Sequence, residues 1–195
     1  MGVQKLVSAV NAGVPMDELK PHNCHEAVLG WLLRSKISDE RFNVDAWLAV
    51  RALAKKAGSA NPKQVTGEWM GRNIYHAHSR QVAPPFGAHS LVLGDVLSFG
   101  QHAPHHSMVV VRKNGTRAFA MGFNNAGVFG QRQRMVFDGT SHEVTDGDFW
   151  DSNNQFKGAN GGCDLFAMDA RLAATALEKA LEALDIDRPG TFAFG

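Results

Sequence analysis

Hydrophobic residues follow two different spacings along the chain. In the N-terminal part they recur every three or four positions, which predicts helices at 3–10, from Cys24 onward, at 45–56 and, from a weaker pattern, at 66–75. The helix that begins at Cys24 has one apolar face, made of Cys24, Ala27, Val28, Trp31 and Leu32. The chain is therefore expected to begin with amphipathic helices.

From residue 96 onward the spacing becomes that of short strands. Runs rich in valine and phenylalanine predict strands at 96–99, 107–112 and 117–121, and weaker runs lie at 143–145 and 164–168. Between the second and third runs, Asn114-Gly115 predicts a tight hairpin turn. This part of the chain is therefore expected to form antiparallel strands.

The order of these elements predicts the fold class. Helices followed by antiparallel strands indicate an α+β fold, with N-terminal helices packed on an antiparallel sheet. The segment 81–87, with two consecutive prolines, is expected to be a loop. Asp169 is expected to cap a closing helix whose buried face carries Leu172, Leu177, Leu181 and Leu184. No linker divides the chain, so residues 1–195 are expected to form a single domain.

Composition narrows the classes of function. Hydrophobic residues make up 44% of the chain and charged residues 20%, which is typical of a globular protein. The 20 basic and 19 acidic residues nearly cancel, so neither nucleic acid nor a membrane is expected as a partner. A cleaved signal peptide is not recognisable. The expected location is the cytoplasm of the producing cell, or outside it by export without a cleaved signal.

Cys24 is the first candidate for chemistry. A cysteine at the start of a helix lies among unpaired backbone N–H groups, which favour an anion and are expected to lower the thiol pKa. The same N–H groups can hold the oxyanion of a tetrahedral intermediate. The alternative is that Cys24 is a small buried core residue. The chain has two cysteines, too few for a disulfide scaffold or an all-cysteine zinc site.

Histidines and asparagines flank the predicted hairpin. Three histidines precede its first strand and two asparagines follow its second: His102, His105, His106, Asn124 and Asn125. A two-residue turn at Asn114-Gly115 pairs positions that sum to 229, which sets His105 opposite Asn124. A three-residue turn with a bulge changes the sum to 228, which sets His106 on the same face as Asn124. Either register places an amide beside an imidazole that it can orient.

The order Cys, His, Asn resembles that of papain-like cysteine peptidases, and most closely their NlpC/P60 and CHAP amidase branch. Four segments between about residues 20 and 130 carry the resemblance: Asn23-Cys24, Gly94–Phe99, His105–Val110 and Gly122–Asn125. The segment 37–85 is a long insertion relative to that pattern. The resemblance implies a papain-like fold and a hydrolase that cleaves an amide bond.

The resemblance also implies roles for individual residues. Cys24 would be the nucleophile, His106 the general base with His105 as the alternate, and Asn124 the residue that orients the imidazole, with Asn125 as its alternate. A small residue two positions after the histidine, as in the amidases, selects His105. A small residue one position after it, as in many papain-like sequences, selects His106, which is preferred here because Ser107 leaves room beside the ring. No cofactor is required.

The implied substrate is a peptide or a peptidoglycan-type amide. An effector toxin delivered to another cell fits such a domain, and an immunity or inhibitor protein would then be its partner. Two alternatives share the fold: a protein glutamine deamidase or acyltransferase, and a binding module without activity. A zinc site formed by His22, Cys24, His25 and the histidines at 102–106 is a further alternative. Its spacing matches no standard zinc motif, so no metal is expected.

Overall fold

The computed structural model describes residues 2–13, 24–37, 78–83, 90–99, 106–126, 134–136, 141–144, 165–173 and 175–176. Two helices come first, α1 (Gly2–Asn11) and α2 (Cys24–Arg34). A six-stranded antiparallel sheet follows in the order β1-β8-β2-β3-β4-β7. Its strands are β1 (Arg80–Val82), β2 (Val96–Phe99), β3 (His106–Asn114), β4 (Arg117–Met121), β7 (His142–Glu143) and β8 (Leu165–Met168). Two short strands, β5 (Asn124–Ala126) and β6 (Arg134–Val136), pair with each other in a second sheet.

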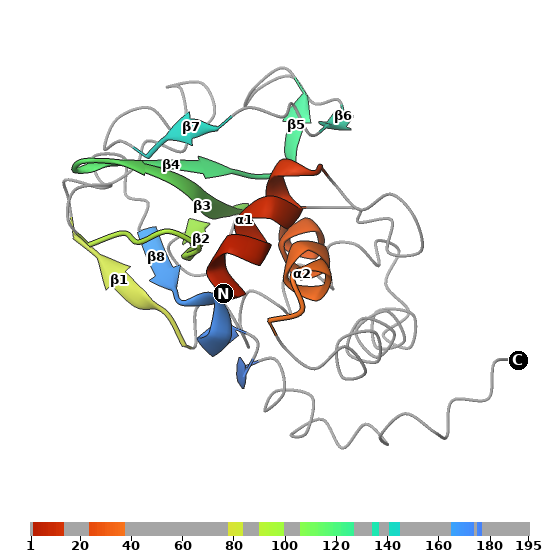
Figure 1. Cartoon of the computed structure of the whole chain (residues 1–195). Coiled ribbons are helices and arrows are strands. Elements are labelled where there is room, and N and C mark those ends of the chain that lie inside the picture. Colours follow the sequence, from red (N-terminus) through yellow and green to blue (C-terminus); the bar gives the residue numbers. More distant parts are fainter. Residues whose placement is uncertain are drawn as a thin grey trace, which may run out of the picture.

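The two helices cover one face of the large sheet. Figure 1 shows α1 and α2 next to each other, and both contact β3. Side chains alternate between the two faces of a strand, so neighbouring residues of each strand belong to different hydrophobic clusters. Val96, Val109 and Met168 pack with the helices, whereas Leu97, Met108 and Ala167 form a separate cluster on the other face. In β3, Ser107 has the parity of Val109 and the helix face, and His106 has the parity of Met108 and the opposite face.

The observed elements confirm the predicted class: an α+β arrangement with N-terminal helices on an antiparallel sheet. The helices at 3–10 and from Cys24 are present, and the strands at 96–99 and 117–121 have the predicted bounds. The strand predicted at 107–112 is longer, since β3 runs from His106 to Asn114. The helices predicted at 45–56 and 66–75 lie outside the described residues. The single-domain organisation stays a prediction.

Two local predictions were wrong. The segment 81–87 does not start as a loop, because β1 extends to Val82 and pairs with β8. Asp169 does cap the closing helix, through a 2.8 Å hydrogen bond from the backbone N–H of Arg171 to its Oδ1. Leu172 is nevertheless 46% exposed. Within residues 169–173 and 175–176, the buried positions are Ala170, Ala173 and Ala176, and Leu177, Leu181 and Leu184 lie outside the described part of the chain.

The register of the β3–β4 hairpin also differs from both predicted registers. The turn lies at Gly115 and Thr116, and Asn114 faces Arg117, so paired positions sum to 231. A bulge at Val111 changes the pairing, and beyond it Val109 faces Met121 with a sum of 230. The turn starts one residue later than predicted because Gly115, with φ of 58°, takes the left-handed conformation.

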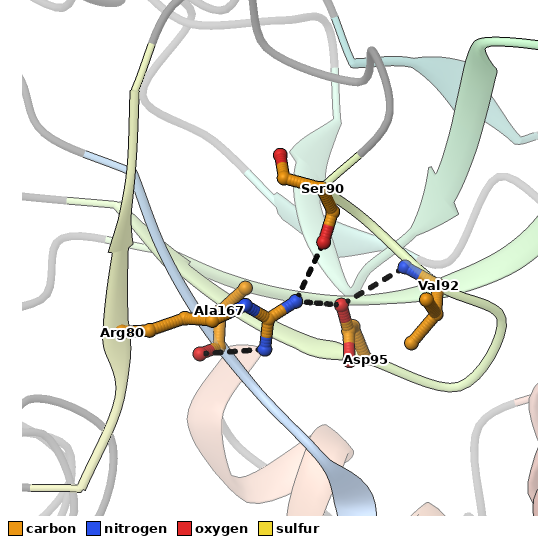
Figure 2. A network of polar contacts seen from close by, with 5 residues as sticks. All are labelled: Arg80, Ser90, Val92, Asp95 and Ala167. Atoms are coloured by element: carbon orange, nitrogen blue, oxygen red, sulfur yellow. Dashed lines mark hydrogen bonds and ion pairs between the residues drawn. The ribbon is translucent and has the colours of Figure 1, made fainter.

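A buried carboxylate fixes the turn that leads into β2. Figure 2 shows Asp95, whose side chain is fully buried, between the guanidinium of Arg80 from β1 and Val92. One carboxylate oxygen, Oδ2, accepts hydrogen bonds from Arg80 at 2.6 Å and from the backbone N–H of Val92 at 3.0 Å. The same guanidinium donates to the carbonyl oxygens of Ser90 and Ala167. Arg80 therefore ties β1, β8 and the start of β2 together.

We expect substitutions of the two partners of this ion pair to lower the free energy of unfolding by unequal amounts. Arg80→Met leaves a fully buried carboxylate without its cation, and we expect it to lower the free energy of unfolding by about 2 kcal/mol. Asp95→Asn leaves a half-exposed guanidinium that water can solvate, and the loss should be less than half as large. Urea unfolding followed by circular dichroism measures both changes.

Arg117→Met provides the matched control, because it breaks the exposed ion pair between Arg117 and Glu143. Its effect on the urea midpoint should be the smallest of the three. Equal losses for Arg80→Met and Asp95→Asn would contradict the interpretation of this network.

Candidate active site

Cys24 is the first residue of a firmly anchored helix. Behind it on α2, Ala27, Val28 and Trp31 are fully buried against the sheet and α1. The indole N–H of Trp31 donates to the carbonyl oxygen of Gly13, at 3.0 Å, which fixes α2 against the end of α1. Cys24 itself is 6% exposed and is a free thiol. The helix therefore holds its first turn, and the thiol on it, at a defined place on the sheet.

That place is the start of β3. The backbone N–H of Ser107 donates a hydrogen bond to the sulfur of Cys24. The hydroxyl of the same serine lies 2.7 Å from Nδ1 of His25, the next residue of α2. Ser107 is fully buried, and its partner across the β2–β3 ladder, Ser98, is also buried. The first turn of α2 and the first residues of β3 thus form a polar cluster in an otherwise apolar interface.

Burial raises the pKa of the Cys24 thiol from 9.0 to about 11. Backbone N–H groups of Ser107, His25 and Cys24 act in the opposite direction, as expected for a helix start, but their combined effect is smaller. The negative charge of Glu26 raises the pKa further. The expectation of a lowered thiol pKa is therefore wrong, because the cost of removing a thiolate from water exceeds the stabilisation by these N–H groups.

His106 lies on the other face of β3 from Ser107. Its side chain is 5% exposed, and its Nε2 approaches the bare backbone of Gly122. A Cβ atom on Gly122 would lie 3.1 Å from that nitrogen and 2.8 Å from Cγ of Met108. The ring therefore occupies space on the Met108 face that the glycine leaves open. The role of His106 as general base stays a prediction.

The asparagines have left the β3–β4 ladder. That ladder ends at the pair Val109–Met121, and Asn124 begins β5, where it faces Val136 of β6. Asn125 faces Met135 in the same small sheet. The side chains of Asn124 and Asn125 lie outside the described part of the chain, as do His102, His105 and Asn23. Their catalytic roles stay predictions.

The structure brings two further residues to Cys24 that the sequence analysis gave no catalytic role, His25 and Ser107. Their signal in the sequence was weak. Ser107 opens a run of valines, where a buried polar side chain needs a partner, and His25 directly follows the candidate nucleophile. Linking them required knowing which residue of β3 the helix meets.

The described residues contain neither a cluster of metal ligands nor a membrane-spanning helix. Within them, no group of three or more histidine, cysteine, aspartate or glutamate side chains could hold a metal ion. His22 and His102, which belong to the zinc alternative, lie outside those ranges. No described helix is long and apolar enough to cross a membrane.

Comparisons with protein-family models, curated proteins and solved structures found no match for this chain. The site is therefore interpreted from its own residues and from the motif resemblance alone.

We expect the alkylation of Cys24 by iodoacetamide to follow the raised pKa. At pH 8 the folded protein should react about a hundredfold more slowly than the urea-unfolded chain, because two pKa units separate their thiolate fractions. The rate in the folded state should keep rising up to about pH 11, whereas the unfolded chain should level off near pH 9.0. Mass-spectrometric peptide mapping separates Cys24 from Cys163.

The same shift links thiol ionisation to stability. The unfolded chain loses the thiol proton first, so the fold should lose stability as the pH rises from 9.0 toward 11. Equal alkylation rates for folded and unfolded Cys24 at pH 8 would contradict the described burial of the thiol.

Proposed function

We propose that this protein is a cysteine hydrolase of papain-like, NlpC/P60-like architecture that cleaves an amide bond with Cys24 as its nucleophile. The observation that carries the proposal is the docking of the first turn of α2 on Ser107 of β3, where His25 Nδ1 lies 2.7 Å from the Ser107 hydroxyl and the Ser107 N–H acts on the Cys24 thiol. This contact brings the thiol at a helix start to the strand that directly follows the histidine cluster. A nucleophile at a helix start and a base at the mouth of a neighbouring strand are the two parts that thiol acyl transfer needs.

The raised pKa of Cys24 decides how such a reaction would begin. At neutral pH the buried group is a thiol, so a preformed thiolate is not its resting state. The histidine would take the thiol proton as the sulfur attacks the carbonyl carbon, and would then pass it to the departing amine. Water would hydrolyse the resulting thioester and regenerate the thiol. Backbone N–H groups in the first turn of α2 would stabilise the oxyanion.

Strand parity supports His105 as the base ahead of His106. Residues two apart on an extended strand share a face, and Ser107 faces Cys24 and His25. His106 has the parity of Met108, on the opposite face of β3 from Ser107, which leaves its alternate, His105. The small residue two positions after the base, typical of the amidase branch, is then Ser107 itself. Asn124 or Asn125 would orient the imidazole.

The substrate is proposed from the motif resemblance. A peptide amide, above all one in the stem peptides of peptidoglycan, is the substrate class of that branch. A wall amidase acts outside the cytoplasm, so the protein would be exported, and an immunity or inhibitor protein would protect cells that contain the same bond. A deamidase or acyltransferase acting on a protein side chain would use the same cysteine and histidine.

A binding module without activity is the second candidate. The low exposure and raised pKa of Cys24 favour it, because a core thiol has both properties. Both candidates keep the same fold and differ in whether Cys24 is chemically required.

We expect Cys24→Ala and Cys24→Ser to abolish hydrolysis of purified peptidoglycan, because each removes the attacking thiol. Digests analysed by mass spectrometry should contain released or shortened stem peptides with the wild type, and none with either variant. Cys163→Ser is the matched control and should retain the wild-type products. Undiminished products with Cys24→Ala would contradict a cysteine hydrolase, and an unchanged peptidoglycan profile with the wild type would exclude the wall substrate.

The two neighbouring histidines provide a second matched pair. His105→Ala should reduce the rate of the same digestion by at least a hundredfold, since the thiol loses its base. His106→Asn should retain most of the activity, provided that thermal denaturation shows an intact fold. The opposite ranking would return the role of base to His106 and would contradict the parity argument.

A further inference from the structure

Two consecutive residues of α2 are held by a single residue of β3. Ser107 donates its backbone N–H to the sulfur of Cys24, and its hydroxyl is hydrogen-bonded to the His25 ring. All three side chains are at least nine-tenths buried. We propose that His25 is a positioning residue, whose bond to the Ser107 hydroxyl holds the Ser107 N–H on the Cys24 sulfur. The proposal rests on the proposed function, and it adds a residue that acts through Ser107.

The geometry explains why one bond affects the other. The Oγ and the backbone nitrogen of Ser107 are separated only by Cβ and Cα, so holding the hydroxyl limits how far the N–H can move. The 2.7 Å distance between Nδ1 and Oγ is that of a close hydrogen bond. Sliding β3 along α2, or turning the first turn of the helix, would lengthen both contacts together.

The bond suits this task because it does not depend on one protonation form of the ring. When neutral Nδ1 lacks a hydrogen, the serine hydroxyl donates to it; when Nδ1 carries one, the hydroxyl oxygen accepts. Either form keeps the two atoms together. Ser98, opposite Ser107 on β2, is also buried, so protein atoms and not water lie on that side of Ser107.

The test uses the pH profile of Cys24 alkylation by iodoacetamide in the full chain. His25→Leu removes the ring nitrogen, Ser107→Ala removes the hydroxyl but keeps the backbone N–H, and the double variant removes both. His25→Asn places a polar atom near the position of Nδ1 and serves as the rescue. His78→Leu changes an exposed histidine and is the matched control.

We expect His25→Leu and Ser107→Ala each to raise the midpoint of the profile by about half a pH unit, with alkylation at pH 8 about threefold slower. The double variant should shift no further than either single variant, since both remove the same link. His25→Asn and His78→Leu should follow the wild type. Circular dichroism and urea unfolding show whether each variant is folded, and Ser107→Ala keeps the test decisive if His25→Leu fails to fold.

Three results would overturn the proposal. An unchanged profile in Ser107→Ala means that the hydroxyl does not hold the N–H on the sulfur. A lower midpoint of the pH profile with faster alkylation in His25→Leu means that the His25 ring only keeps water away from the Cys24 sulfur. Additive shifts in the double variant mean that His25 and Ser107 act separately. Alkylation needs no substrate, so a failed hydrolase is recognised separately, by peptidoglycan digestion without products alongside the expected thiol profile.

Discussion

The docking of the first turn of α2 on the first residues of β3 is the contact on which the rest of the site depends. Ser107 makes it by bonding to the sulfur of Cys24 and to the ring of His25. The apolar side chains behind Cys24 on α2 fix the helix, and the antiparallel ladders with β2 and β4 fix the strand. The ion pair between Asp95 and Arg80 holds the turn that precedes β2. Together these contacts fix the position of the Cys24 thiol.

This arrangement gives Cys24 two opposing influences. The helix start and the Ser107 N–H favour a thiolate, as in many reactive cysteines, whereas the surrounding side chains exclude the water that would solvate it. Burial has the larger effect, so the resting group is a protonated thiol. The proposed hydrolase would start from this state and would need a base that acts during the attack, so the proposal depends on where the histidine lies.

The sequence predicted those parts of the fold that depend on short-range patterns. The helical spacing of Val28 and Trp31 identified the buried face of α2, and the valine-rich runs identified β2, β3 and β4. Leu172 was assigned to the buried face of the closing helix because the sequence there is rich in leucine, but its side chain is exposed. The chain there buries Ala170, Ala173 and Ala176, whose small side chains permit close packing.

The parts that could not be predicted depend on long-range contacts. The bulge at Val111 lets Val111 stay in the core while Arg112 lies 3.6 Å above the Phe119 ring, and this shifts every pairing nearer the site. The contact of His25 with Ser107 spans 82 residues and leaves no periodic signal. The pKa of Cys24 was predicted with the wrong sign because the sequence shows the helix start but not how deeply it is buried.

The most direct test of the central claim is the distance from Cys24 Sγ to the nearest histidine ring nitrogen in a crystal structure of the wild-type protein. We expect a nitrogen of His105 to lie within about 4 Å of the sulfur. A structure in which the sulfur lies more than about twice that distance from the rings of both His105 and His106 would contradict it.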